Sequence, residues 1–315
     1  MWELLPLDWH VVGVGDFNGD GISDILLRND NGTVTDWLGQ PNGTLVDNSQ
    51  HASFGTGADW QIVGTGDFNG DGMSGVLWRR NDGAMSDWLG DSNGSFTVNS
   101  AVNITTGSEW QIAGTGDFNG DGRTDVLWRR NDGALSDWLG QQNGGFWINT
   151  NFNATAGTEW KVVGTGDFNG DGKADLLWER TDGALSDWLG QANGGFAVNS
   201  GISLNAGAGW HVAGVGDFND DGFSDLLWRK DDGTITNWLG WANGAFTDNS
   251  SIASQPVSTD LQVAGVGDFN GDGFSDVLLR NTDGTLETWV GSTGGGILST
   301  SEKLWEDARS SQSIF

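Results

Sequence analysis

Six copies of one acidic string hold most of the side chains in this sequence that could bind an ion. The string reads Gly-Asp-Phe-Asn-Gly-Asp-Gly, and in the first copy side-chain oxygens recur at positions 1, 3, 5 and 9, as Asp16, Asn18, Asp20 and Asp24. Glycine stands at position 6, and Ile22 at position 7 can offer its backbone carbonyl. Alternating oxygen ligands around a sharp glycine turn are the first nine positions of a calcium-binding loop. Oxygen-only ligands at this density suit Ca²⁺ better than Mg²⁺, which requires a stricter octahedron.

The same ligand positions return in every copy, so we predict structural calcium in these loops. Asn, Asp and Gly also form ordinary turns, and a single copy would not distinguish a turn from an ion site. Two copies depart from the pattern, because position 9 is Gly75 in the second copy and Asp220 replaces the glycine at position 4 in the fifth. We therefore expect about five to six ions, with the second site weak. The predicted ligands, of which the position-7 residues contribute only a carbonyl oxygen, are Asp16, Asn18, Asp20, Ile22 and Asp24; Asp67, Asn69, Asp71 and Met73; Asp117, Asn119, Asp121, Arg123 and Asp125; Asp167, Asn169, Asp171, Lys173 and Asp175; Asp217, Asn219, Asp221, Phe223 and Asp225; and Asp268, Asn270, Asp272, Phe274 and Asp276.

The elements that position these loops follow from the repeat. The first aspartates of the strings lie 51, 50, 50, 50 and 51 residues apart, and short apolar runs bounded by Gly, Asn or Asp surround each string. Such runs predict strands, at Val11–Asp16, Asp24–Arg28, Thr33–Leu38 and Thr44–Asn48 in the first repeat. Four antiparallel strands in each of six repeats predict an all-β fold, a six-bladed β-propeller. The alternative is a seven-bladed ring of which some repeats are missing from this chain.

The ends of the repeats divide the chain into three parts. We expect the propeller to cover residues 9–300, with residues 1–8 as an amino-terminal lead and residues 301–315 as a tail that is either a short helix or disordered. Residues Trp2–Leu5 could instead add an outer strand to the sixth blade and close the ring.

The charge of the chain excludes some classes of partner. A formal net charge of −29 and a pI near 4.1 repel phosphate backbones and anionic lipid surfaces, so we expect no nucleic acid partner. No apolar run is long enough to predict membrane insertion. The first residues lack the basic and apolar regions of a signal peptide, and the chain has no cysteine for disulfides.

Tryptophan recurs with the repeat, in the string Asp-Trp-Leu-Gly and in the second strand of the middle repeats. The favoured interpretation is packing between neighbouring blades, and the alternative is a set of platforms on which sugars stack. Two indoles break the repeat, Trp241 in a turn and Trp147 in an outer strand, and these are the candidate ligand contacts.

The sequence favours a binding protein over an enzyme. Its three histidines, His10, His51 and His211, lie in different repeats, and an active site needs one asymmetric group of residues. The aspartates of the Asp-Trp-Leu-Gly strings, such as Asp87, are predicted to pair with arginines of a neighbouring strand, such as Arg79 or Arg129.

The string Gly-Asp-Phe-Asn-Gly-Asp-Gly-x-x-Asp, repeated in register over residues 9–300, resembles the FG-GAP/VCBS repeats of integrin α-subunit propellers and of many bacterial exoproteins. The resemblance implies a β-propeller that holds Ca²⁺ in the hairpin between the first two strands of each blade. It also implies extracellular recognition, since family members mostly serve adhesion, a fungal lectin with similar repeats binds amino sugars between blades, and some polysaccharide lyases share the scaffold. Familiar integrin propellers have seven blades, so six is a departure.

The expected function is therefore that of a secreted, calcium-stabilised binding module for a protein or a cell-surface glycan. A multivalent lectin with sites between the blades is the alternative, and a polysaccharide lyase or hydrolase domain is a third. Loops without the bidentate glutamate at position 12 belong to the weak calcium sites of extracellular modules, which places the protein outside the cell.

Overall fold

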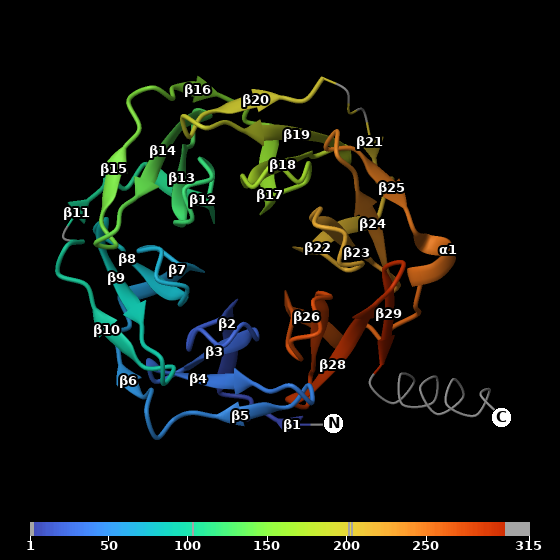
Figure 1. Cartoon of the computed structure of the whole chain (residues 1–315), viewed down its shortest axis with the longest axis horizontal. Helices are drawn as coiled ribbons and strands as arrows, with labels where there is room; N and C mark the ends of the chain where they lie inside the picture. Colours follow the sequence, from blue (N-terminus) through green and yellow to red (C-terminus); the bar gives the residue numbers. More distant parts are fainter. Residues whose placement is uncertain (1–2, 103, 201, 203, 300–315) are drawn as a thin grey trace.

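Six antiparallel sheets stand around a central axis in the computed structural model, which describes residues 3–102, 104–200, 202 and 204–299 (Figure 1). The six-bladed β-propeller is thus confirmed, and the seven-bladed alternative is wrong. Trp2 and the tail from Ser301 lie outside the described residues. In the first blade the strands are β2 (Trp9–Gly15), β3 (Asp24–Asn29), β4 (Thr33–Gly39), β5 (Leu45–Asp47) and β6 (Phe54–Gly55).

The other blades repeat this order with nearly the same lengths. Their elements are β7 (Trp60–Gly66), β8 (Gly75–Arg80), β9 (Ala84–Gly90), β10 (Phe96–Val98) and β11 (Ile104–Thr105); β12 (Trp110–Gly116), β13 (Asp125–Arg130), β14 (Ala134–Gly140), β15 (Phe146–Ile148) and β16 (Ala154–Thr155); β17 (Trp160–Gly166), β18 (Asp175–Arg180), β19 (Ala184–Gly190), β20 (Phe196–Val198) and β21 (Leu204–Asn205); β22 (Trp210–Gly216), β23 (Asp225–Lys230), β24 (Ile235–Gly240), β25 (Phe246–Asp248) and α1 (Ser250–Ala253); and β26 (Leu261–Gly267), β27 (Asp276–Asn281), β28 (Thr285–Ser292) and β29 (Gly296–Ser299).

The link from one blade to the next is a short strand that the sequence analysis did not predict. β6 pairs with the start of β4 before the chain enters the second blade, and β11, β16 and β21 do the same farther along. β1 (Glu3–Leu4) pairs with the start of β28 in the sixth blade, and the Leu5 amide donates to the Gly284 carbonyl at 3.0 Å. The amino-terminal segment therefore joins the last blade to the first through the contact that β6, β11, β16 and β21 make, whereas between blades five and six only an isolated bridge of Gln255 with Ile235 takes this place in the described structure. The sequence had offered such a strand for residues Trp2–Leu5 alone, and the pairing of Glu3 and Leu4 with the sixth blade confirms it.

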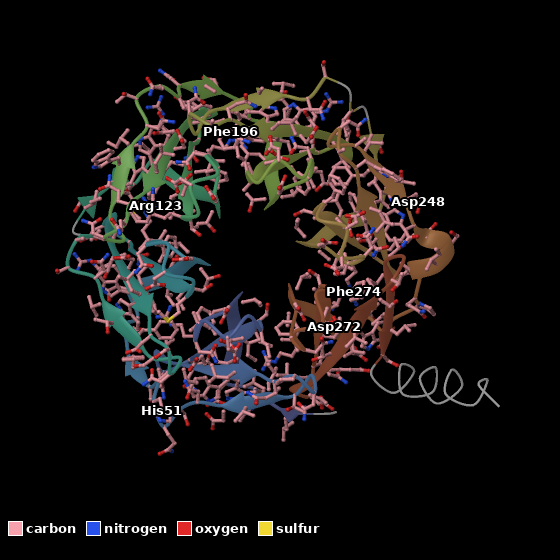
Figure 2. All side chains as sticks on the ribbon, viewed as in Figure 1. His51, Arg123, Phe196, Asp248, Asp272 and Phe274 are labelled. Carbon is pink, nitrogen blue, oxygen red and sulfur yellow. The ribbon has the colours of Figure 1, made fainter. Side chains whose placement is uncertain are left out.

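The hydrophobic core is divided into clusters, each shared by two neighbouring blades. The phenylalanine of every acidic string is fully buried, and Phe17 of the first blade packs edge-on against Phe96 of the second, with ring centroids 5.4 Å apart. Trp78, Trp128, Trp178 and Trp228 are 1% exposed, and each lies next to the tryptophan of its own Asp-Trp-Leu-Gly or Asn-Trp-Leu-Gly string. Packing is confirmed as the role of these indoles. Side chains fill the spaces between the blades, and few reach the middle of the ring (Figure 2).

A second, polar contact joins the blades, and its partner was predicted wrongly. Asp87 is fully buried in β9 and accepts a hydrogen bond from Asn99 Nδ2 at 3.2 Å, and the same Nδ2 donates to the Asn143 carbonyl of the third blade at 2.8 Å. Arg79, the predicted partner, donates instead to Thr106 and Gly107. Equivalent aspartate–asparagine pairs join the next blade in three further places, Asp36–Asn48, Asp137–Asn149 and Asp187–Asn199.

Candidate calcium-binding loops and the opposite face

Each acidic string forms the loop between the first two strands of a blade. In the first loop, Asp16 Oδ1 accepts from the amide of Gly19 at 2.7 Å, and Asp16 Oδ2 accepts from the amide of Gly21 at 2.8 Å. Asp20 Oδ1 accepts from the amide of Ile22 at 2.9 Å. The two glycines have φ of +76° and +85°, which turns their amides toward the Asp16 carboxylate. Carboxylates at positions 1 and 5 therefore face the inside of the loop, where the sequence pattern requires ligands.

The six loops are connected to one another in a closed ring. The amide at position 8 of each loop donates to the carbonyl at position 1 of the preceding loop, as Ser74 does to Asp16 at 2.6 Å. The ring closes because Ser23 of the first loop donates to Asp268 of the sixth at 2.7 Å. Arg123, Asp272 and Phe274 of the loops lie nearer the ring centre than His51 and Asp248 (Figure 2). A change in one loop therefore reaches both neighbours through the backbone.

The aspartate at position 9 has a different environment from the other predicted ligands. Asp24 is fully buried, with Oδ2 accepting from the Phe17 amide at 2.8 Å and Oδ1 from the Gly39 amide at 2.8 Å, so it ties the loop to β4. Burial raises the pKa of this carboxyl to about 7, against the effect of the two amides, and the charges of Asp20 and Asp16 raise it further. Asp125, Asp175, Asp225 and Asp276 are equally buried and make the same two contacts.

The comparisons with known proteins agree with this geometry. A family described as FG-GAP-like repeat matches residues 16–78, 67–128, 117–178 and 217–279, and one described as FG-GAP repeat matches residues 262–299. The chain belongs to the FG-GAP repeat family. The resemblance found in the sequence is thereby confirmed, and no curated protein matches this FG-GAP chain.

Solved structures share the propeller fold at low sequence identity. A chain of the Photorhabdus luminescens Tc holotoxin pore, carrying the TccC3-D651A mutation, is 16% identical with a TM-score of 0.56. The match covers 91% of this chain and 14% of the toxin chain, so the FG-GAP propeller spans a small part of that protein's length. Two others are BBS1N in complex with ARL6DN (10% identity, TM-score 0.49, 91% of this chain and 94% of that one) and the rhamnogalacturonan lyase YesW (14%, 0.41, 91% and 72%).

The loops fit calcium in the chemistry of their donors. Among the described residues, no three His, Asp or Glu side chains are arranged to hold a metal by themselves, so asparagine and backbone oxygens have to complete the ligand set. The fifth loop has an asparagine oxygen available as such a ligand. Asp220 alters the turn there, with φ of +56°, and Asn219 Oδ1 is buried without a hydrogen-bond partner in the described structure. A buried acceptor of this kind needs a hydrogen-bond donor or a cation, and in the first loop the Asp20 amide donates to the equivalent Asn18 Oδ1. When bound, calcium would supply a cation to Asp217, Asn219, Asp221 and the Phe223 carbonyl.

Calcium titration should separate the second loop from the others. Loop 2 has Gly75 in place of the buried aspartate, so we expect calorimetry to show about five similar sites and a weaker or absent sixth. Gly75→Asp should restore it only if β9 moves, because a Cβ on Gly75 would lie 2.5 Å from the Trp88 carbonyl oxygen. Gly75→Ala, which adds the Cβ without a carboxylate, is the matched control. Six equal sites in the unaltered protein would contradict the unequal loops.

The ends of the blades opposite the loops carry the positive charge. All lysines and arginines in the described part of the chain except Arg123 and Lys173 lie there: Arg28, Arg79, Arg80, Arg129, Arg130, Lys161, Arg180, Arg229, Lys230 and Arg280. Arg123 and Lys173 pair within their own loops, with Asp121 at 2.6 Å and Asp171 at 3.1 Å. The FG-GAP propeller thus has a strongly acidic loop face and a second face of nearly balanced charge, which we call the arginine face.

The two indoles singled out from the sequence lie on the surface, away from each other. Trp147 of β15 is 72% exposed, whereas Trp241 is 55% exposed and its Nε1 donates to Thr247 Oγ1 at 2.7 Å. The histidines have separate partners, with His10 bonded to Asp30, His211 to Asp231 and His51 to Asn48. No helix in the described residues is long and apolar enough to cross a membrane.

Proposed function

We propose that this FG-GAP propeller is an extracellular, calcium-stabilised binding module that recognises a protein or a cell-surface glycan. The exposed indole of Trp147 carries the proposal. Its counterparts in the five other outer strands are Val46, Thr97, Ala197, Thr247 and Leu298, so neither the fold nor the repeat requires an indole there. A large exposed ring that packing does not use is typical of a binding hot spot.

We propose binding and not catalysis because the polar side chains of this chain recur at equivalent positions in the blades and do not form one asymmetric group. Each histidine in the described chain bonds to a residue of its own blade, and the three have separate partners, Asp30 for His10, Asn48 for His51 and Asp231 for His211. An acid, a base and a nucleophile that converge on one point would be needed for turnover. Release of product from a polysaccharide by the purified chain would overturn this part of the proposal.

A crevice at the rim between the second and third blades favours a lectin as the second candidate. It has a volume of about 290 Å³ and is lined by Trp110, Trp128, Trp138, Ser136 and Ile148, among others. The Trp110 ring and the Ser136 hydroxyl are half-buried there, whereas Trp128 and Trp138 are buried. An indole ring beside a hydroxyl suits a sugar ring, which offers an apolar face and many oxygens.

A glycan array and a pull-down from cell-surface extracts, both in millimolar calcium, test the proposal. Trp147→Ala should weaken binding about tenfold or more, since contact tryptophans commonly contribute more than 1 kcal/mol. The variant gives blade three the residue that blade four has at Ala197, so folding should be unaffected. Trp241→Gln, which gives blade five the residue that blade four has at Gln191, is the control for a general loss of indole surface. Binding that survives Trp147→Ala at full strength would remove Trp147 from the site.

A further inference from the structure

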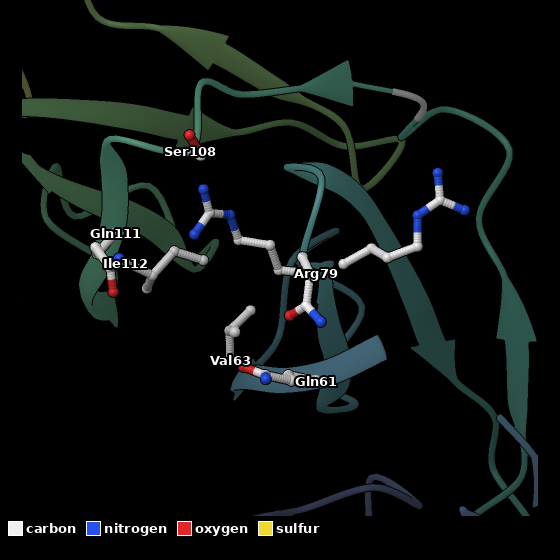
Figure 3. Close-up of a pocket in the computed structure, with 8 residues that line it drawn as sticks. Gln61, Val63, Arg79, Ser108, Gln111 and Ile112 are labelled. Carbon is white, nitrogen blue, oxygen red and sulfur yellow. The ribbon is translucent and has the colours of Figure 1, made fainter. Parts of the chain in front are cut away.

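Two pockets on the arginine face are built from equivalent residues of different blades. One has a volume of about 380 Å³ and lies between blades two and three, where Gln61 and Arg79 face Ser108 and Gln111 (Figure 3). The other, of about 400 Å³, lies between blades five and six, where His211 and Arg229 face Thr259 and Gln262. Three blades separate the pockets in a ring of six, so they lie on opposite sides of the axis. Both volumes fall in the range of small-ligand sites.

Each pocket contains a guanidinium group with an unused donor. Arg79 extends from β8 across the gap toward Ser108 (Figure 3) and donates to the Gly107 carbonyl at 3.1 Å, while its Nε is buried without a partner in the described structure. Arg229 donates to the Ser258 carbonyl at 3.1 Å, and its Nη1 is likewise buried without one. Neither arginine forms an ion pair with any described residue. A buried charged donor without an acceptor is costly, so each pocket favours a ligand that supplies an anionic oxygen.

The equivalent positions in the other gaps differ in part. Arg129, between blades three and four, donates from both Nη atoms, to the Trp160 and Gly157 carbonyls. Between blades four and five the arginine is replaced by Glu179. Arg28 donates to Thr56 and Gly57 as Arg79 does to Thr106 and Gly107, and Arg280 donates to the Pro6 carbonyl while its Nε is buried without a partner in the described structure. A free guanidinium donor is therefore not unique to Arg79 and Arg229, and the inference depends on the coincidence of such a donor with a pocket at both places.

The pocket walls indicate what surrounds the anionic group. Gln61, Asn81 and Gln111 bring side-chain amides and Ser108 a hydroxyl to the first pocket, against the aliphatic Val63 and Ile112. Amides and hydroxyls both donate and accept, as the hydroxyl groups of a sugar do. The Arg79 guanidinium is also fixed in orientation, since it lies over the Trp128 ring at 5.5 Å. The amides and the hydroxyl that line the pocket therefore suit an acidic sugar better than an acidic peptide. The hydroxyls of a sugar can form hydrogen bonds with these groups, whereas the aliphatic carbons of an aspartate or glutamate side chain cannot.

We propose that the pockets between blades two and three and between blades five and six each bind one carboxylate-bearing sugar residue of an acidic glycan, held by Arg79 and Arg229. The acidic loops do not oppose this, because they lie at the other end of the blades. Burial lowers the pKa of both guanidiniums, and Glu109 offsets this at Arg79 alone. This proposal rests on the proposed function, and it specifies the class of ligand and the location of the two binding sites.

Calorimetry of the calcium-loaded full chain with glucuronate and galacturonate tests the proposal, with glucose and galactose as matched neutral sugars. Two sites per chain are expected for the uronates, and at least tenfold weaker binding for the neutral sugars. Arg79→Gln and Arg229→Gln should each remove one site, and the double variant both. Arg129→Gln is the control, since Arg129 lines neither pocket. Because Arg79→Gln also removes the bond to Gly107, Ser108→Tyr provides a second variant that narrows the first pocket and leaves the arginine in place.

The outcomes distinguish this proposal from the general one. Equal binding of neutral and acidic sugars, or two sites that persist in the Arg79→Gln/Arg229→Gln double variant, would overturn the assignment of the carboxylate. Binding of a short glutamate peptide at these sites without uronate binding would overturn the glycan. A glycan or protein ligand that the double variant still binds would retain the proposed function and overturn only these two sites.

Discussion

Replacing buried Asp87 with asparagine is expected to raise the free energy of unfolding at pH 8 by on the order of 2 to 4 kcal/mol and to leave it nearly unchanged at pH 4. Burial raises the pKa of Asp87 to about 7 from an ordinary 3.8, against the hydrogen bond from Asn99. One of its carboxylate oxygens has no partner in the described structure. Since the folded state binds this proton more tightly than the unfolded state, the stabilisation is complete below pH 4 and is lost as the pH rises through 7.

The fifth blade already contains the substituted form of this contact. Asn237 stands where Asp87 stands in the second blade, accepts from Asn249 Nδ2 at 3.0 Å, and donates its own Nδ2 to the Gly295 carbonyl of the next blade at 2.8 Å. A neutral carboxyl at Asp87 could donate in the same way at the equivalent turn, whereas a carboxylate could not. The contact between blades is therefore complete in blade five at every pH and in blade two only when Asp87 is protonated.

The reverse substitution is the control, and both are measured by denaturant unfolding at pH 4 and pH 8 in saturating calcium. Asn237→Asp should destabilise the protein at pH 8 and much less at pH 4. Asp36, whose pKa is raised to about 7, and Asp137 and Asp187, raised to about 6, should behave as Asp87 does; burial is the main cause in each, and the Asp47 charge adds to it at Asp36. An Asp87→Asn effect of the same size at both pH values would show that the carboxyl is not a proton-dependent contact.

The asparagine partner of these aspartates was available in the sequence and was missed. An asparagine follows each one after twelve residues, as Asn48 follows Asp36 and Asn249 follows Asn237, and this spacing recurs in the first five of the six repeats. The prediction of an arginine partner considered only charge and the neighbouring strand. It failed because an amide can satisfy the aspartate and the next blade's carbonyl at once, whereas Arg79 pairs with Met85, two residues from Asp87 toward the other end of the blade, and binds the linker carbonyl of Gly107.

The positions of the strands were predicted well because glycine and aspartate mark their ends. Contacts between blades could not be predicted in the same way, because the sequence of one repeat does not show how the next repeat packs against it. The first strand begins at Trp9 and not at Val11, since Trp9 and His10 continue the pairing with Asn29 and Arg28. The burial of Asp24 depends on the Gly39 amide, fifteen residues away on another strand. The calcium-loop spacing predicts a ligand at position 9, but it contains no information on a contact between that residue and β4. The pairing of β6 with β4 likewise depends on how one blade follows another.

Chelation of calcium is expected to lower the melting temperature substantially, because all six loops share one hydrogen-bonded ring. Ion binding stabilises the folded state by about 2.7 kcal/mol per site at a hundredfold excess over Kd, and several sites act together here. In the first loop the charges of Asp16 and Asp20 already act unfavourably on Asp24, and no cationic side chain in the described loop offsets them. Loosening of that loop would weaken the Ser74–Asp16 and Ser23–Asp268 bonds, so the loss should extend to neighbouring blades.

The charge in one loop can be changed without removing its hydrogen bonds. Asp20→Asn keeps an oxygen for the Ile22 amide while removing one negative ligand, so it should reduce the stabilisation by calcium and leave the EDTA-treated protein as stable as before or more so. Asp132→Asn, at an exposed turn of the arginine face, is the control and should not change the calcium dependence. Thermal unfolding monitored by tryptophan fluorescence measures both effects. It is recorded in EDTA and in roughly 2 mM calcium, a concentration at the level of weak extracellular sites. A melting temperature that EDTA leaves unchanged would show that the loops hold their shape through the amide contacts of Asp16, Asp20 and Asp24 alone.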